Sequence, residues 1–398
     1  MRGAFLICAV VLAACPGAAA GSKVGAAAAH PQIQVGGFPT GIALNPLTNT
    51  IYVGNGTTGT LSLINGKKCN AGDTRGCGQH VTAVTAGTDP IGIAVNGKTN
   101  TVYVANASGT VAVVNGGKCD AANTSGCHVQ PATVRVGTNP QFLAVDEKTN
   151  TIYVANSSSD TISVIDGSTR RVRATVRVGP LPFTLAVNEA TGSVYVTDLG
   201  AATISVIDAK ACNATNVSGC RHKPITVNVG ERPGGIAVNS RTDTIYVAGE
   251  SSNDVSVLDG RTCNAQATSG CRQTPLHVLA GSGARGIAVN EVTNTVYVAN
   301  TVANTVSVIN GATCNATVHT GCGQQAAVAP VGVSPRRVAV DEVTNTIYVT
   351  NAGSNTVTML DGRTCNGRVH TGCGAAGSSS TTPPKTTPTL IPPPPYTA

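Results

Sequence analysis

The sequence predicts an all-β fold in which seven four-stranded antiparallel sheets form a closed ring. Three observations lead to this prediction: a tyrosine-containing phrase recurs seven times, each copy contains four β-type segments, and the two ends of the repeated region complete one another. The chain has 398 residues, of which 41% are hydrophobic and 11% are charged. That composition is typical of a folded chain, and the length is sufficient for one large all-β domain.

The repeated phrase is Ile or Val followed by Tyr-Val, and its spacing defines the repeating unit. Successive tyrosines of the phrase are 51, 50, 42, 51, 51 and 51 residues apart, a period typical of radially repeated β-structures. We expect these tyrosines to pack between neighbouring repeats, with their hydroxyl groups near an edge. They are Tyr52, Tyr103, Tyr153, Tyr195, Tyr246, Tyr297 and Tyr348.

Each copy divides into four short β-type segments. In the sixth copy these begin with the small apolar Gly286–Asn290, followed by the phrase around Tyr297 and the alternating Thr305–Ile309. The third segment usually ends in Asn-Gly or Asp-Gly, as at Asn65-Gly66, and we expect this pair to supply the positive φ angles of a tight turn. A fourth segment such as Val134–Gly137 then leads through a Gly-x-x-Pro connection into the next copy.

The seventh copy lacks a fourth segment before the Pro-rich end of the chain. A matching segment, Ile33–Gly36 followed by Pro39, stands at the start of the repeated region. Radial repetition leaves sheets with few exposed edges, so a strand from the N-terminal end is expected to complete the last sheet. The sequence therefore predicts a seven-bladed β-propeller over residues 32–374, closed by this N-terminal strand.

The tyrosine phrases extend into a longer motif that resembles a known family. Tyr103–Asn106 and Tyr297–Asn300 read Tyr-Val-Ala-Asn, and Tyr348–Asn351 reads Tyr-Val-Thr-Asn, which is similar to the YVTN β-propeller repeat of YncE-like and surface-layer-associated proteins. The fourth and fifth copies depart from the motif, with Asp198 and Gly249 at the last position. The resemblance implies a propeller with an extracytoplasmic binding or scaffold role. Propellers host many activities, so the motif does not specify a ligand.

The two ends of the chain differ in composition from the repeats. Residues 1–14 combine a basic start with an apolar stretch that ends before Cys15, which predicts a lipoprotein-type signal peptide and lipidation of Cys15. Ordinary cleavage after Ala20, which would give a secreted protein, is the alternative. Residues 15–31 are expected to form a flexible tether and the Ser/Thr/Pro-rich residues 375–398 a disordered tail. We therefore expect an exported protein that faces the extracytoplasmic side of the cell membrane, attached by its lipid alone.

The remaining twelve mature cysteines form six local pairs, each located between the third and fourth segments of a copy. In an exported chain such pairs predict disulfides, whereas two thiols without a recurring His or acid supply at most half a zinc site. The third copy has no pair and turns directly through Asp166–Arg171. The predicted disulfides are Cys69–Cys77, Cys119–Cys127, Cys212–Cys220, Cys263–Cys271, Cys314–Cys322 and Cys365–Cys373.

A candidate ligand site follows from the way connections alternate between the two faces of a propeller. The turns between second and third strands share one face with the connections between blades, and they surround the mouth of the central channel. Arginines gather there on three adjacent copies, with Phe183 as an apolar wall, and guanidinium groups suit a carboxylate or a phosphate. The alternative is that they are solvated residues paired with Glu231 and Glu250. The arginines are Arg232, Arg285, Arg336 and Arg337.

The sequence contains no catalytic constellation that we can assemble, and we expect a binding or scaffold protein without a metal or other cofactor. Its partner is expected to be an envelope glycan, an anionic small molecule or a protein, and a monomer is the default state. A lactonase- or lyase-like enzyme that uses the channel mouth is the competing class. A binder of single-stranded nucleic acid is a further alternative, although the net charge of +7 and the scarcity of aromatic residues argue against it.

Overall fold

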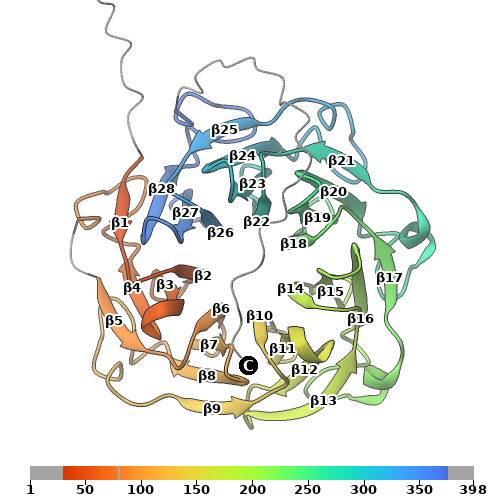
Figure 1. Ribbon diagram of the computed structural model, residues 1–398, viewed down its shortest axis with the longest axis horizontal. Coiled ribbons are helices and arrows are strands. Elements are labelled where there is room, and N and C mark those ends of the chain that lie inside the picture. The colour runs from red at the N-terminus through yellow and green to blue at the C-terminus, as the bar shows by residue number, and fades with distance from the viewer. Residues whose placement is uncertain (1–29, 79–80, 375–398) are drawn as a thin grey trace, which may run out of the picture.

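A computed structural model describes residues 30–78 and 81–374, and it has the predicted architecture. Seven four-stranded antiparallel sheets are arranged as blades around a central channel (Figure 1). The predicted signal peptide, Cys15, the tether up to residue 29 and the tail from residue 375 lie outside the described residues. Within the described ranges, no helix has the length and apolar character needed to cross a membrane.

Each blade is a meander whose first strand lines the channel and whose fourth strand lies at the outer rim (Figure 1). From the inner to the outer strand, the blades are blade 1, β2 (Pro39–Asn45), β3 (Thr50–Asn55), β4 (Thr60–Asn65) and β5 (Thr82–Thr85); blade 2, β6 (Pro90–Asn96), β7 (Thr101–Asn106), β8 (Thr110–Asn115) and β9 (Ala132–Arg135); blade 3, β10 (Pro140–Asp146), β11 (Thr151–Asn156), β12 (Thr161–Asp166) and β13 (Arg171–Arg177); blade 4, β14 (Pro182–Asn188), β15 (Ser193–Asp198), β16 (Thr203–Asp208) and β17 (Ile225–Asn228); blade 5, β18 (Pro233–Asn239), β19 (Thr244–Gly249), β20 (Asp254–Asp259) and β21 (Leu276–Leu279); blade 6, β22 (Ala284–Asn290), β23 (Thr295–Asn300), β24 (Thr305–Asn310) and β25 (Ala327–Pro330); and blade 7, β26 (Pro335–Asp341), β27 (Thr346–Asn351), β28 (Thr356–Asp361) and β1 (Gln32–Gln34).

The ring closes through the N-terminal strand, as the sequence predicted. β1 pairs antiparallel with β28, and Ile33 lies opposite Val357. The side chain of Ile33 is 1% exposed and packs with Tyr348 in the core between blades 7 and 1. The last blade is therefore built from both ends of the repeated region, so the ring cannot open at this blade without exposing a hydrophobic core.

The hydrophobic core consists of seven clusters, one at each junction between neighbouring blades. At the junction of blades 5 and 6, for example, Tyr246 and Val255 pack against Ile287 and Val296. All seven repeat tyrosines are at most 1% exposed, which confirms that they form the core between blades. Strand alternation explains this arrangement, because one face of each sheet contacts the preceding blade and the other face contacts the next.

The glycine after the third strand has a different role from the one expected. Gly66 is not among the residues with positive φ, and the positive φ in this region belongs to Asn49 in the turn between β2 and β3. The Gly66 amide donates to the Asn49 carbonyl, and a Cβ atom at Gly66 would approach the Asn49 Oδ1 to 2.2 Å. Glycine is needed there because two turns approach closely, and the prediction of a positive φ at this position was wrong.

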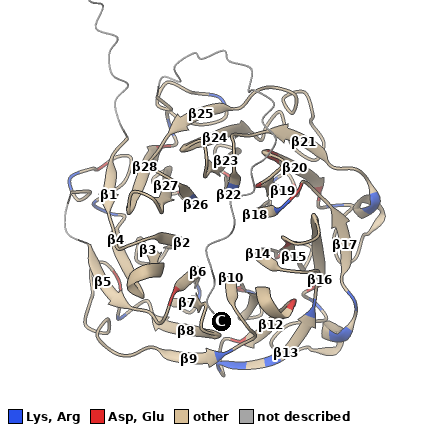
Figure 2. Ribbon diagram, viewed as in Figure 1, with Lys and Arg blue, Asp and Glu red and all other residues tan. Residues whose placement is uncertain are grey.

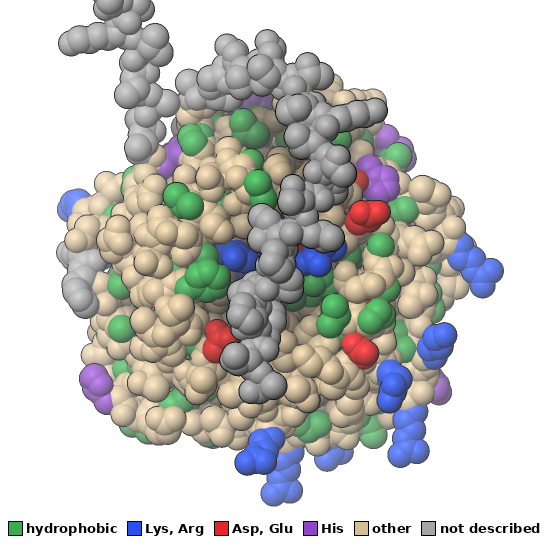
Figure 3. All heavy atoms as spheres, viewed as in Figure 1, with side chains coloured by type: hydrophobic (Ala, Val, Ile, Leu, Met, Phe, Trp, Pro, Cys, Tyr) green, Lys and Arg blue, Asp and Glu red, His purple; other side chains and the backbone are tan. Residues whose placement is uncertain are grey.

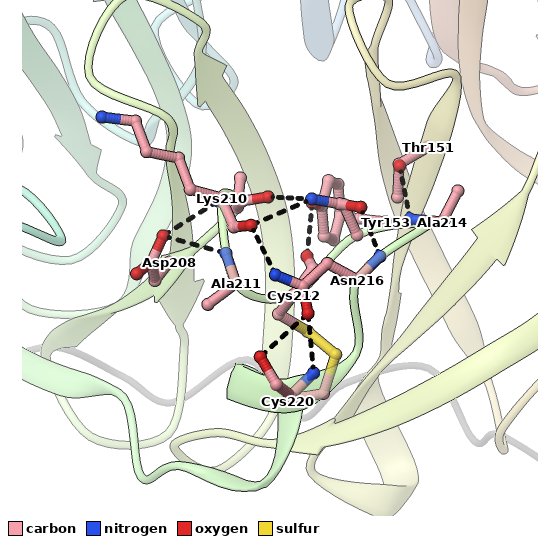
Figure 4. Close-up of a disulfide and its surroundings, with 12 residues drawn as sticks. Thr151, Tyr153, Asp208, Lys210, Ala211, Cys212, Ala214, Asn216 and Cys220 are labelled. Carbon is pink, nitrogen blue, oxygen red and sulfur yellow. Dashed lines mark hydrogen bonds between the residues drawn. A yellow bond between two sulfur atoms is a disulfide. The ribbon is translucent and has the colours of Figure 1, made fainter.

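The six predicted cysteine pairs are all disulfide-bonded. This confirms the pairing and indicates an oxidising, extracytoplasmic environment. Each loop also reaches the preceding blade, a role that the sequence did not suggest. Tyr153 of blade 3 donates its hydroxyl hydrogen to the carbonyl of Cys212 in blade 4 at 2.7 Å, and the Ala214 amide donates to Thr151 at 2.8 Å (Figure 4).

The same tyrosine-to-cysteine hydrogen bond occurs at six of the seven junctions. The exception is the junction of blades 2 and 3, because blade 3 has no cysteine loop to accept a bond from Tyr103. The disulfide loops therefore connect neighbouring blades as well as the third and fourth strands of their own blade.

Candidate functional site

The face predicted to hold the ligand site carries the turns between second and third strands and the connections between blades. Their contact is direct, since the Glu250 amide in a blade 5 turn donates to the carbonyl of Arg232 in the connection that precedes that blade. Lys and Arg positions lie close to the channel beside β18 and β22 (Figure 2). The space-filling view shows basic side chains near the centre of this side of the ring (Figure 3).

The inner strands determine which side chains reach the channel. Four of them have glycine at the third position, namely Gly41, Gly92, Gly235 and Gly286. A Cβ atom at Gly286 would lie 2.8 Å from the Cα atom of Arg337 in the next blade, so glycine allows the inner strands to pack closely. The remaining third positions hold Phe142, Thr184 and Arg337.

Arg337 extends from blade 7 to the opposite side of the channel. Its guanidinium carbon lies 3.8 Å from the centre of the Phe142 ring of blade 3 and 5.0 Å from that of Phe183 of blade 4. The two rings meet edge to face, with their centres 5.3 Å apart. Strands β10 and β14 lie across the ring from β26 (Figure 1). The stacked arginine and phenylalanines therefore fill the channel at this level.

The guanidinium of Arg337 is buried without a carboxylate partner of its own. The residue is 8% exposed, its Nη1 donates a 3.4 Å hydrogen bond to the Arg285 carbonyl, and its Nη2 has no hydrogen-bond partner among the described residues. Desolvation lowers the pKa of Arg337 well below its usual value, and the charges of Arg285 and Arg336 lower it further, while Glu250 raises it. A buried donor left without an acceptor is costly, so the site is suited to receive an anion.

Arg285, Arg232 and Glu250 form the rim of the same cluster. Arg285 Nη1 lies 2.8 Å from Glu250 Oε1, and Arg232 Nη2 lies 3.8 Å from Glu250 Oε2. Arg285 also lies over the Phe183 ring at 5.1 Å. Arg232 is 55% exposed in its side chain, so the alternative of a solvated, paired arginine describes Arg232 but not the buried Arg337.

Arg336 occupies the position beside Arg337 on β26 and contacts a third phenylalanine. Its guanidinium carbon lies 5.2 Å from the centre of the Phe38 ring, in the connection that precedes blade 1. The structure thus brings Arg232, Arg285, Arg336, Arg337 and Phe183 into one region. We call these five residues, with Phe38, Phe142 and Glu250, the channel cluster.

Phe38 and Phe142 were missed in the sequence analysis, although a signal for them existed. The chain has only four phenylalanines, and the three that lie in the described residues all contact an arginine of the channel cluster. In a chain with 3% aromatic residues, the placement of each phenylalanine at or beside an inner strand was informative.

The asparagine that ends most second strands connects elements within its blade. Asn156 Nδ2 donates to Ser163 Oγ at 2.9 Å and to Thr161 Oγ1 at 3.2 Å, while its Oδ1 accepts the amide hydrogen of Gly137. We had expected this side chain to satisfy the turn that follows it, but it instead bonds the third strand and the incoming connection. It contributes to the scaffold rather than to the ligand site.

No metal site is apparent on this face. Among residues 30–78 and 81–374, no group of three or more His, Cys, Asp or Glu side chains is placed to hold a metal ion. The chemistry available in the channel cluster is that of several guanidinium groups, one carboxylate and three aromatic rings. Such a set suits an anion that carries an apolar or planar part.

Comparison with known proteins defines the class. The family model described as lactonase, 7-bladed beta-propeller, matches residues 50–372, and the chain therefore belongs to this family. The solved structure of Kuenenia stuttgartiensis hydrazine synthase is similar, with a TM-score of 0.64 and 16% sequence identity over 87% of this chain and 99% of that chain. At that identity the likeness concerns the fold alone. No curated protein matches the chain.

Proposed function

We propose that this protein binds a small organic anion at the channel mouth, as a non-catalytic binding module of the extracytoplasmic space. The observation that carries the proposal is the buried guanidinium of Arg337, whose Nη2 lacks a hydrogen-bond partner among the described residues. Glu250 is the carboxylate paired with Arg285 and Arg232, and it leaves the cluster with more positive than negative groups. A carboxylate or phosphate would offset this charge and accept the free donors.

A thermal-shift panel on the purified chain tests the proposal. The probes are phosphate, citrate, gluconate, 6-phosphogluconate and glucuronate, each compared with an equal concentration of chloride. We expect at least one organic anion to raise the melting temperature of the wild type and to have no effect on the variant Arg285→Ala/Arg336→Ala. Specific binding to the native state produces such a shift by mass action.

The matched control is Arg261→Ala/Arg363→Ala, which removes two arginines that pair with Asp259 and Asp361 after the third strands of blades 5 and 7. It makes the same change in net charge away from the channel cluster. An anion effect of equal size in the wild type and in both double variants would refute a site at the channel mouth.

Lactone hydrolysis is a second candidate, favoured by the family match and by one feature of Glu250. Its Oε2 is buried and accepts no hydrogen bond among the described residues. That oxygen is free to take a proton from water as the water oxygen attacks a lactone carbonyl. The ring C–O bond then breaks, and the leaving alkoxide takes the proton.

The test for catalysis is release of acid from glucono-δ-lactone and 6-phosphogluconolactone, followed with a pH indicator. Activity that is lost in Glu250→Gln while anion binding persists would establish catalysis in this cluster. Binding of an anion without turnover of either lactone would leave binding as the function.

We further propose that the chain is exported and carries a lipid on Cys15, as a YVTN-type envelope protein. The six disulfides support an oxidising location, and the residues before Cys15 support the cleavage site. Labelling of expressing cells with palmitate tests the anchor. We expect label on the wild type and none on Cys15→Ser, and the absence of label on both would favour secretion after Ala20.

A further inference from the structure

The outer strand of blade 3 differs from the other six outer strands in length and in charge. β13 has seven residues, whereas the other outer strands have three or four. Four arginines occur between Gly167 and Pro180, with no acidic residue in that segment. Figure 2 shows the basic positions along β13, at the outer rim of the ring. The four are Arg170, Arg171, Arg173 and Arg177, which we call the rim row.

The side chains of the rim row face solvent. Ala174 and Val176 pack into the core between blades 3 and 4, while Arg173 and Arg177 occupy the alternate positions and are exposed. Exposed Arg135, at the end of β9 in the neighbouring blade, adds a fifth guanidinium beside the row, since β9 and β13 are in contact. Within residues 30–78 and 81–374, none of these five guanidinium groups has an ion pair or a hydrogen bond.

The shape of the row indicates the kind of anion that fits it. Alternate residues of a strand are about 6.7 Å apart, so Arg171 to Arg177 extends over roughly 20 Å in one line. A linear polymer with regularly repeated anionic groups can pair with each guanidinium in turn, and Arg matches phosphate geometry well. β13 contains no aromatic residue on which nucleobases would stack, and it has no aromatic or bulky apolar anchor for a lipid surface.

We propose that the rim row binds a linear phosphate polymer along the outer edge of blade 3. The row shares no residue with the channel cluster, so this site is independent of the ligand proposed above. Charged residues on an edge strand also prevent edge-to-edge pairing of sheets. The experiment must therefore separate a protective role, which any charge fulfils, from recognition of a polyanion, which needs positive charge.

The test measures binding of long-chain inorganic polyphosphate to the purified chain at several NaCl concentrations. The key variant is Arg171→Glu/Arg173→Glu/Arg177→Glu, which keeps the edge charged but reverses its sign. We expect its affinity for polyphosphate to be lower than that of the wild type by about a hundredfold at low salt, and its salt dependence to be weaker. Light scattering is expected to show that this variant remains unaggregated, because the edge is still charged.

The matched control reverses three arginines near the cysteine loops, in Arg75→Glu/Arg261→Glu/Arg363→Glu, for the same change in net charge. Single variants Arg173→Gln and Arg177→Gln cover the case in which a triple variant does not fold, and each is expected to weaken the salt dependence by about one counterion. Pyrophosphate serves as the short probe and is expected to bind far more weakly than the polymer.

Three results would overturn the proposal. One is failure of the wild type to bind polyphosphate near physiological salt. The second is an equal loss of affinity in the rim and control variants, which would indicate net charge alone. The third is binding to vesicles containing anionic phospholipid without binding to polyphosphate, which would assign the row to a membrane surface.

Discussion

Blades 6 and 3 have the same strand order, but their third and fourth strands are joined in different ways. In blade 6 a disulfide loop separates β24 from β25, and the carbonyl of its Cys314 accepts a hydrogen bond from Tyr246 of blade 5 at 2.7 Å. In blade 3 the turn from Asp166 to Arg171 is direct, and the core cluster shared by blades 2 and 3 contains no cysteine. The comparison shows that a blade needs the loop for its junction with the preceding blade, not for its own sheet.

The outer strand reflects the same difference. Without a loop, β12 and β13 pair from Asp166–Arg171 to Thr161–Arg177, which lengthens β13. In blade 6 the pairing of β24 with β25 covers only Thr305–Pro330 to Val308–Ala327. Blade 3 therefore presents a long edge, and the arginines of the rim row lie on it. Blade 4 departs at another point, since Asp198 replaces the asparagine found at Asn300 in blade 6.

The largest expected effect comes from removing the strand that blade 7 takes from the other end of the chain. Deletion of residues 32–37 removes β1 and the buried Ile33, and it exposes the core next to Val357. We expect the free energy of unfolding to fall by at least about 4 kcal/mol, since truncating one buried Ile alone typically costs 2–5 kcal/mol. Urea denaturation checks this, and an unchanged midpoint would contradict closure by this strand.

The second effect is a gain of stability from Asp198→Asn, which makes blade 4 resemble blade 6. Burial raises the pKa of Asp198 to about 6, against the opposing effect of hydrogen bonds from Ser205 and Thr203. Because the folded-state pKa is above the unfolded value, folded Asp198 retains its proton longer, and stability falls as pH rises from about 4 to about 6. Asparagine at this site can donate to the same hydroxyls, as Asn300 does.

We therefore expect Asp198→Asn to be more stable than the wild type at pH 7 by up to about 3 kcal/mol, with the difference shrinking towards pH 4. Urea denaturation at pH 4, 5, 6 and 7 measures it. A difference that is constant over this range would mean that Asp198 does not titrate there.

The third effect concerns the disulfide loop of blade 6 itself. Cys314→Ser/Cys322→Ser removes a crosslink between residues 8 apart in sequence. We expect a loss of about 2.5 kcal/mol from the greater freedom of the unfolded chain. Urea denaturation under oxidising conditions measures it. A loss well above this value would show that the loop also leaves blade 5 when its crosslink is absent.

The smallest effect separates the two kinds of junction most directly. Tyr246→Phe leaves the buried Cys314 carbonyl without its donor, and we expect a cost of about 1–2 kcal/mol. Tyr103→Phe makes the same chemical change at the junction of blades 2 and 3, where no cysteine carbonyl is opposite, and its cost is expected to be smaller. Equal losses in the two variants, measured by urea denaturation, would contradict the linking role of the loops.

Repetition made much of this fold predictable from sequence. The blade number, the four strands of each blade, the closing strand, the six disulfides and the interblade tyrosines all follow from local patterns that recur seven times. The position of Arg232, Arg285, Arg336 and Phe183 on one face was also predictable, because connections alternate between the faces of a propeller. These features depend on strand periodicity and spacing, which are properties of the chain read locally.

Other features were decided only by the tertiary structure, because they involve residues brought together from different blades. Arg337 contacts Phe142 of blade 3 across the channel, a meeting that depends on ring diameter and on glycines at the neighbouring inner strands. The hydrogen bond from each tyrosine to the next cysteine loop depends on how neighbouring sheets dock. The sequence by itself determined the number and kind of elements, whereas their packing decided which charges are buried, and burial controls the chemistry of the channel cluster.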